Sequence, residues 1–222
     1  MKGNRFLKFI VILFFIAGGY LGYRAYTLVF GKALDLEKEE IAFYIKSGWG
    51  SKQVLQALEK EANLKNPKWA ERVMEKKNYN GDLVVSGKYT LTDDMSLNTL
   101  IDHLRAGNGE EEVNVTFNSA RTLEEIAGDV ANYIEADSID LVVAMTSNEM
   151  AAKFGFDPTS FKTMFFPDTY RMEWDTDAEE FISRMASEYK TFWTGERKSK
   201  ARSLGLSQSE VTTLASIVQA VQ

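Results

Sequence analysis

The sequence predicts an α+β protein with one N-terminal transmembrane helix followed by two small domains. Residues 9–30 form an apolar run that is almost free of charge. Residues 41–107 then alternate strand-like and helix-like hydrophobic patterns. A polar, acidic segment at 107–112 that contains glycine separates them from a second set of such patterns at 112–222.

The composition excludes several classes of site. The chain of 222 residues is 45% hydrophobic and 12% aromatic, which is enough to build packed cores. It has no cysteine, so disulfides, thiol nucleophiles and Cys-ligated zinc are excluded. His103 is the single histidine, and we expect it on a helix surface, with no metal site and no Ser-His-Asp triad. All 32 acidic residues follow residue 30, and so acidic a body does not suit nucleic-acid binding.

The N-terminal apolar run is the predicted membrane anchor, at residues 9–30. Its uncharged part, Phe9 to Tyr23, spans only about 22 Å as a helix. Flanking apolar residues and snorkelling of Lys8 and Arg24 extend it toward the thickness of the hydrocarbon layer. Residues 1–8 are basic and are expected in the cytoplasm, which places the bulk of the chain outside a cell (inner) membrane. The alternative is a signal peptide that is cut near its small residues.

A short charged linker at 31–40 leads into the first domain, 41–107. Its pattern reads as strand, helix, helix, strand and helix, which is a small α+β module. The strands are expected at Ile41–Lys46 and within Leu83–Leu91. The helices are expected to begin with Ser51 as a cap, at Pro67 behind Asn66, and at Ser96, with the last one ending at Gly107.

The second domain, 112–222, opens with an alternating strand at Val113–Phe117 and is then mostly helical. We expect a loop, not a strand, at Met164–Tyr170. Three pairs of a hydroxyl residue and a glutamate three positions later predict capping boxes at helix starts. These pairs are Thr122 with Glu125, Thr176 with Glu179, and Ser207 with Glu210.

The last helix, Leu206–Gln222, carries apolar residues at helical spacing, which predicts one buried face. The residues of this stripe are Val211, Leu214, Ile217, Val218 and Val221. Because the pattern still runs at the final residue without a Gly or Pro stop signal, we expect the chain to be incomplete at its C-terminus.

Three segments carry a resemblance to a known family. Ser86–Leu91, with Met95–Leu97 and Leu104–Gly107, is similar to the end of a LysM-like module. Phe165–Tyr170 (FFPDTY) matches a loop motif closely, and Leu214–Val218 (LASIV) matches a helix that ends in a catalytic glutamate. Together, over nearly the whole chain, they resemble the YceG-like endolytic murein transglycosylases, which are single-pass membrane proteins.

The resemblance implies a LysM-like module at 41–107 and a transglycosylase domain at 112–222. Members of this family are expected to cleave the β-1,4 bond between N-acetylmuramic acid and N-acetylglucosamine inside peptidoglycan strands. One glutamate gives its proton to the leaving oxygen and then takes one from the 6-hydroxyl of the sugar, which closes a 1,6-anhydro ring. The implied partners are glycan strands, the lipid bilayer and proteins of cell-wall synthesis, with no cofactor and no metal.

The sequence departs from the family at the catalytic position. Carried over residue by residue, the glutamate falls on Val221, and valine has no proton to give. We therefore expect no lytic activity from the sequence as written. Asp168, Tyr170 and Phe166 remain as substrate-side candidates, although Asp168 also suits a turn and the two rings also suit a core.

The alternative function is of a different class. A protein from the same lineage that lacks the catalytic glutamate could bind peptidoglycan without cleaving it. It could equally bind the proteins that build septal or side-wall peptidoglycan.

Overall fold

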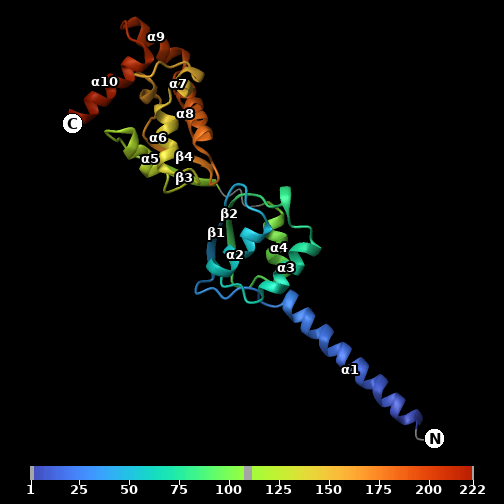
Figure 1. Ribbon diagram of the computed structural model, residues 1–222. Coiled ribbons are helices and arrows are strands. Elements are labelled where there is room, and N and C mark those ends of the chain that lie inside the picture. The colour runs from blue at the N-terminus through green and yellow to red at the C-terminus, as the bar shows by residue number, and fades with distance from the viewer. Residues whose placement is uncertain (1–2, 108–111, 222) are drawn as a thin grey trace. The chain divides into compact units, whose positions relative to one another are not determined.

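The computed structural model describes residues 3–107 and 112–221, with the backbone alone at 3–10 and 220–221. The chain forms two compact units, Met1–Glu111 and Glu112–Gln222 (Figure 1). Each unit combines helices with one two-stranded sheet, so the architecture is mixed α/β. Of the acidic segment expected between the domains, residues 108–111 lie outside the described chain.

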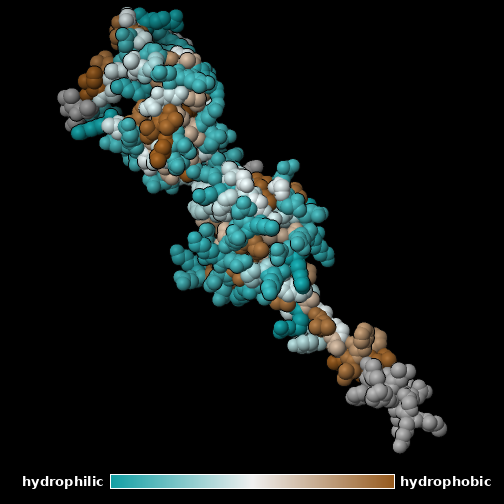
Figure 2. All heavy atoms as spheres, in the orientation of Figure 1, coloured by the Kyte–Doolittle hydropathy of each residue, from teal (hydrophilic) through white to brown (hydrophobic). Residues whose placement is uncertain are grey.

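The apolar N-terminal segment forms a single helix, α1 (Gly3–Phe30). Within it, Val11–Phe30 is a stretch of 20 residues with a mean hydropathy of 1.3, long and apolar enough to cross a membrane. Large side chains along it are exposed, among them Phe14 at 77% and Leu21 at 67%. Figure 2 shows this part of the helix as a mostly hydrophobic surface.

The body of the first unit follows the order strand, helix, helix, strand, helix. Strands β1 (Glu40–Ile45) and β2 (Gly87–Thr92) pair antiparallel, with Phe43 opposite Tyr89. A 3-10 turn, η1 (Gly81–Leu83), precedes β2. The helices are α2 (Ser51–Glu61), α3 (Pro67–Lys76) and α4 (Leu97–Arg105).

The core of the first unit lies between this sheet and the three helices. The buried strand residues alternate with exposed ones, as a half-buried sheet requires. Fully buried side chains include Phe43, Ile45, Leu58, Tyr89, Leu91, Leu100 and Leu104. The expectation for His103 needs correction, because its ring packs edge-on against Tyr89 at 5.8 Å between ring centres. Its Nε2 atom is buried and has no hydrogen-bond partner within the described chain.

Helix boundaries in the first unit follow the predicted signals with one exception. Ser96 accepts a hydrogen bond from the Thr99 N–H, as a cap should. Gly107 has φ +67°, a conformation that glycine adopts without strain after a helix. The predicted cap at Ser51 is wrong: Gly50 is the N-cap, and Gln53 reaches back to the Gly50 N–H.

The second unit contains the other sheet and six α-helices in its described part. Strands β3 (Glu112–Phe117) and β4 (Asp168–Glu173) pair antiparallel, with Val115 opposite Tyr170. A 3-10 helix, η2 (Phe161–Met164), leads toward β4. The α-helices are α5 (Leu123–Val130), α6 (Ser138–Thr146), α7 (Asn148–Lys153), α8 (Ala178–Phe192), α9 (Gly195–Ser203) and α10 (Gln208–Val221).

Two local expectations for the second unit are corrected by the structure. The segment expected as a loop up to Tyr170 contains the start of β4, because Tyr170 and Met172 turn inward while their neighbours face solvent. The capping box of the long helix is formed by Asp177 and Glu180, one residue later than expected. Asp177 takes this position because its carboxylate accepts the Glu180 N–H, whereas the Thr176 hydroxyl donates to the Glu173 carbonyl.

The expected burial of the apolar stripe on α10 is also corrected. Val211, in the first turn, packs against the core of the second unit. Leu214, Ile217 and Val218 are 52–56% exposed, and the elements that α10 contacts most are η2 and α9. The helix is drawn in red beside the C-terminus in Figure 1.

Candidate functional site

The FPDTY loop enters strand β4 and presents one exposed acid. Asp168 is the first residue of β4 and pairs with Phe117, the last residue of β3. The side chain of Asp168 accepts the N–H of its neighbour Thr169 at 2.7 Å. Across the sheet, the hydroxyls of Thr116 and Thr169 are hydrogen-bonded at 2.8 Å. Asp168 is thus held at the end of the sheet with its carboxylate facing solvent.

Tyr170 is a core residue with a satisfied hydroxyl. Its side chain is 7% exposed, and its ring stacks on Phe117 at 5.6 Å between centres. The hydroxyl donates to the Phe166 carbonyl at 2.6 Å, which ties the loop to the strand that follows it. Burial raises the pKa of Tyr170 to about 12, so the phenol stays protonated near neutral pH.

Phe166 is half-buried and lies among other aromatic rings. It stacks on Tyr189 of α8 at 5.5 Å between centres and contacts Phe192 at 4.7 Å. The loop is therefore fastened to α8 by ring contacts and to β4 by a hydrogen bond. Of the three substrate-side candidates, Asp168 is the exposed one.

Helix α10 is fixed near both ends. The predicted capping box at its start is confirmed: the Ser207 hydroxyl accepts the Glu210 N–H at 3.2 Å, and the Glu210 carboxylate accepts the Ser207 N–H at 2.7 Å. In its last turns the Gln219 amide donates to the Ser119 hydroxyl at 2.7 Å. Ser119 lies two residues beyond the end of β3.

This second attachment connects the helix that contains the LASIV motif with the loop after β3. The residue opposite Asp168 is Phe117, and Ser119 follows it in the chain by two positions. Gln219 belongs to the helix that contains the LASIV motif, two positions before Val221. The backbone of Val221 is helical, and its side chain lies outside the described atoms. The end of α10 is thus hydrogen-bonded to the loop after β3, and the last residue of β3 pairs with the first residue of β4.

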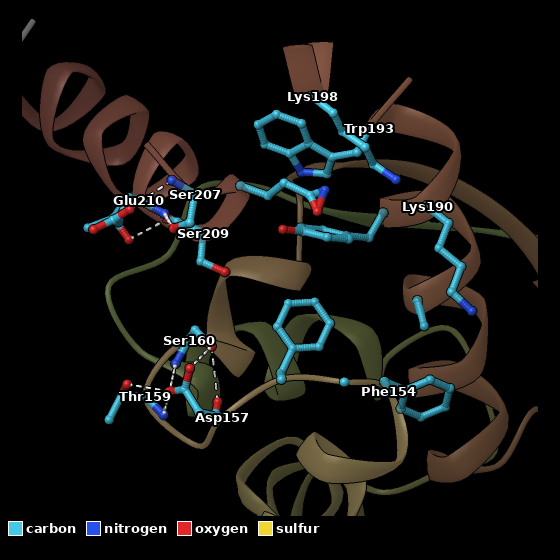
Figure 3. Close-up of a pocket in the computed structure, with 16 residues that line it drawn as sticks. Phe154, Asp157, Thr159, Ser160, Lys190, Trp193, Lys198, Ser207, Ser209 and Glu210 are labelled. Atoms are coloured by element: carbon cyan, nitrogen blue, oxygen red, sulfur yellow. Dashed lines mark hydrogen bonds between the residues drawn. The ribbon is translucent and has the colours of Figure 1, made fainter. Parts of the chain in front are cut away.

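A cavity of about 820 Å³ lies at the other end of α10 (Figure 3). It is bounded by the loop after α7, the end of α8, α9 and the first turn of α10. None of the predicted site residues lines it, but Tyr189, on which Phe166 stacks, does. Its lining residues come from four separate parts of the chain, and the sequence marks one of these parts by the predicted Ser207–Glu210 capping box. Within the described chain, no group of three histidines or acids is placed to hold a metal ion.

Comparisons with known proteins point to one family. The model of the YceG-like family matches residues 43–220. Among solved structures, a YceG-like protein from Listeria monocytogenes is 17% identical, with a TM-score of 0.41. The match covers 77% of this chain and 60% of that one, so the chain spans less than two thirds of the listerial protein. The curated proteins contain no match.

Proposed function

Because this chain belongs to the YceG-like family, we propose that it is built as a membrane-anchored endolytic transglycosylase of peptidoglycan. The bond it is shaped to cleave is the β-1,4 bond between N-acetylmuramic acid and N-acetylglucosamine within a glycan strand. With valine at position 221, the sequence as it stands lacks the proton donor for this reaction. The first unit, in which two strands flank two helices, serves as a LysM-like module.

The observation that carries this proposal is the attachment of α10 to the loop after β3. The Gln219–Ser119 hydrogen bond joins the last turns of the LASIV helix to the loop after β3, and Phe117, the last residue of β3, pairs with Asp168. By helical spacing, position 221 falls on the stripe of Leu214, Ile217 and Val218, on the opposite side of α10 from Gln219. Leu214, Ile217 and Val218 would supply apolar surface on the same helix, which favours the protonated acid.

The proposed chemistry needs a single carboxylic acid. The acid protonates the glycosidic oxygen as the bond to the muramic acid C1 breaks. The resulting carboxylate accepts the proton of the 6-hydroxyl as that oxygen attacks C1, so the acid is regenerated and no water is consumed. Two carboxylates, as in ordinary glycosidases, are unnecessary because the nucleophile belongs to the substrate.

The N-terminal helix supports the proposed location. Its span of 20 residues, Val11–Phe30, is long enough to anchor the chain in a cell membrane. The basic residues Lys2, Arg5 and Lys8 precede this span and favour a cytoplasmic N-terminus. Both folded units would then lie on the outer side, where the glycan strands are.

The test is to restore the acid and look for anhydro products. We expect the full chain with Val221→Glu, incubated with purified sacculi, to release fragments that end in 1,6-anhydro-muramic acid, detected by liquid chromatography and mass spectrometry. The control is Val221→Gln, which matches glutamate in size but cannot donate a carboxylic proton. The unaltered chain and the control should release none. Anhydro products from the unaltered chain, or ordinary hydrolysis products from Val221→Glu, would contradict the mechanism.

A non-enzymatic role is the second candidate, and the valine at position 221 favours it. In this case the chain binds peptidoglycan, or the proteins that build it, and does not cleave the glycan strand. The same assay separates the two functions. Sacculus binding that is unchanged by Val221→Glu, with no cleavage by that variant, would establish the binding role.

A further inference from the structure

The cavity at the start of α10 has the size of a ligand site. Its volume of about 820 Å³ lies within the range of small-molecule pockets, roughly 300–1,000 Å³. The lining combines aromatic rings with hydroxyl, carboxylate and ammonium groups, as Figure 3 shows. Such a mixture suits a ligand that has both a ring or acyl body and charged groups.

One wall of the cavity is aromatic. Tyr189 of α8 contacts Phe156 edge-on at 5.1 Å and Trp193 at 6.2 Å between ring centres. Trp193 is 4% exposed, and its indole N–H has no hydrogen-bond partner within the described chain. Burial raises the pKa of Tyr189, and side-chain interactions of its hydroxyl with Ser209, Trp193 and Thr163 oppose that shift. This wall therefore presents a hydroxyl and an indole N–H next to its aromatic rings.

The two acids of the cavity are occupied by their own turns. The Asp157 carboxylate accepts the N–H groups of Thr159 and Ser160 at 3.0 and 3.1 Å. It also accepts the Ser160 hydroxyl at 2.7 Å. The Glu210 carboxylate is engaged in the capping box with Ser207. Both acids therefore serve to shape the loops around the cavity.

The two lysines that line the cavity form no ion pair with an acid of the described chain. Lys190 lies near the end of α8 and Lys198 lies on α9. In the view of Figure 3 they lie on the side opposite Asp157 and Glu210. Each of these unpaired ammonium groups lines the cavity and offers a cation to which a carboxylate can bind.

We propose that this cavity binds the carboxylated peptide arm of a muramyl unit. The acylated sugar or first peptide group lies against the Tyr189 and Trp193 wall, and a peptide carboxylate lies at Lys190 and Lys198. This inference rests on the proposed function, since the peptide arm is what distinguishes peptidoglycan from an uncharged glycan. Tyr189 lines the cavity and also stacks on Phe166 of the FPDTY loop.

The test is a binding titration on the full chain in detergent micelles, by calorimetry or saturation-transfer NMR. The probes are a muramyl dipeptide with a free carboxylate, the same compound amidated at that carboxylate, and the neutral N-acetylglucosamine disaccharide. We expect the carboxylated probe to bind at least about fivefold more tightly than either neutral probe. The double variant Lys190→Gln, Lys198→Gln should remove this preference, and Trp193→Phe should weaken binding of the carboxylated probe about threefold.

The matched control is Lys200→Gln, on the same helix as Lys198 but outside the cavity and paired with Glu196. It should leave the dissociation constant within about twofold. Equal affinity for the three probes, or the same affinity before and after the double lysine substitution, would overturn the inference. The binding result can be distinguished from cleavage by Val221→Glu. Carboxylate-selective binding without cleavage would refute the proposed enzyme and support the binding site. Cleavage without a preference for the carboxylated probe would support the enzyme and refute the binding site.

Discussion

At the scale of the residue, Asp157 shows how one exposed acid can organise a turn. Its carboxylate accepts two backbone N–H groups and two hydroxyls, from Thr159 and Ser160. These hydrogen bonds, led by those of the two side chains, lower its pKa from the ordinary 3.8 to about 2. The turn leads directly into η2 and borders the cavity.

The lowered pKa predicts a pH dependence of folding stability. The folded chain holds Asp157 ionised down to about pH 2, whereas the unfolded chain protonates it near 3.8. The stabilisation is therefore complete above about pH 4 and is lost as the pH falls toward 2. We expect Asp157→Asn to flatten the fall in melting temperature across this window, measured by circular dichroism between pH 2 and 6.

The control for this prediction is Asp129→Asn, an exposed acid of α5. No hydrogen bond to its carboxylate occurs within the described chain. The melting temperature of this variant should therefore fall between pH 4 and pH 2 as steeply as that of the unaltered protein. If Asp157→Asn also gave a parallel curve, the turn would not be held by the ionised carboxylate.

At the scale of the element, helix starts could be predicted from sequence to within one residue, whereas strand pairing could not. Ser96 and the Ser207–Glu210 pair act locally, within one turn, so the sequence alone identifies them. Strand β4 was missed because Pro167 and Asp168 read as a turn, and the partner strand β3 ends about fifty residues earlier in the chain. The inward alternation of Tyr170 and Met172 was the available signal.

The same contrast explains the candidate site. The motif residues Asp168 and Val221 are visible in the sequence, but the hydrogen bond that joins their surroundings connects Ser119 with Gln219. Nothing local marks that pair, since one hundred residues separate them. The burial of the apolar stripe on α10 was predicted wrongly for a related reason. Periodicity shows which residues share one face of a helix, but it does not show whether another element covers that face.

The cap of α10 predicts a local change in helix stability. Ser207→Ala removes the oxygen that accepts the Glu210 N–H, at a cost of about 1 kcal/mol. Amides in the first turns of α10, around residues 209–213, should therefore exchange with deuterium about fivefold faster, as measured by hydrogen-exchange mass spectrometry. Ser216→Ala, in the same helix but away from its start, should leave these rates unchanged. Equal rates in both variants would mean that the box does not hold the helix start.

At the scale of the whole molecule, α1 is the candidate membrane anchor of the chain. The described part of the span, Val11–Phe30, contains one charged residue, Arg24. From Val11 to Leu21 its large side chains are exposed, whereas Val29 at its end packs against the core of the first unit. The exposed apolar surface of this helix thus requires a nonpolar environment.

A charge in the middle of α1 should weaken membrane insertion. Phe15→Lys places an ammonium group near the centre of the helix, at a cost of about 2.5–3.5 kcal/mol for insertion. We expect a clear shift of the protein from the carbonate-resistant membrane fraction to the soluble or aggregated fraction. Phe15→Leu should stay in the membrane. Loss of both variants from the membrane fraction would indicate that a specific side chain, and not apolarity, directs the helix.

The double support of α10 makes the number of residues along it a fixed quantity. The helix is held by its capping box at one end and by the hydrogen bond to Ser119 near the other. Each added or removed residue would rotate everything beyond it by about 100° and move it about 1.5 Å along the axis. Gln219 would then face away from Ser119, so insertions and deletions between the two supports should be far less tolerated than substitutions.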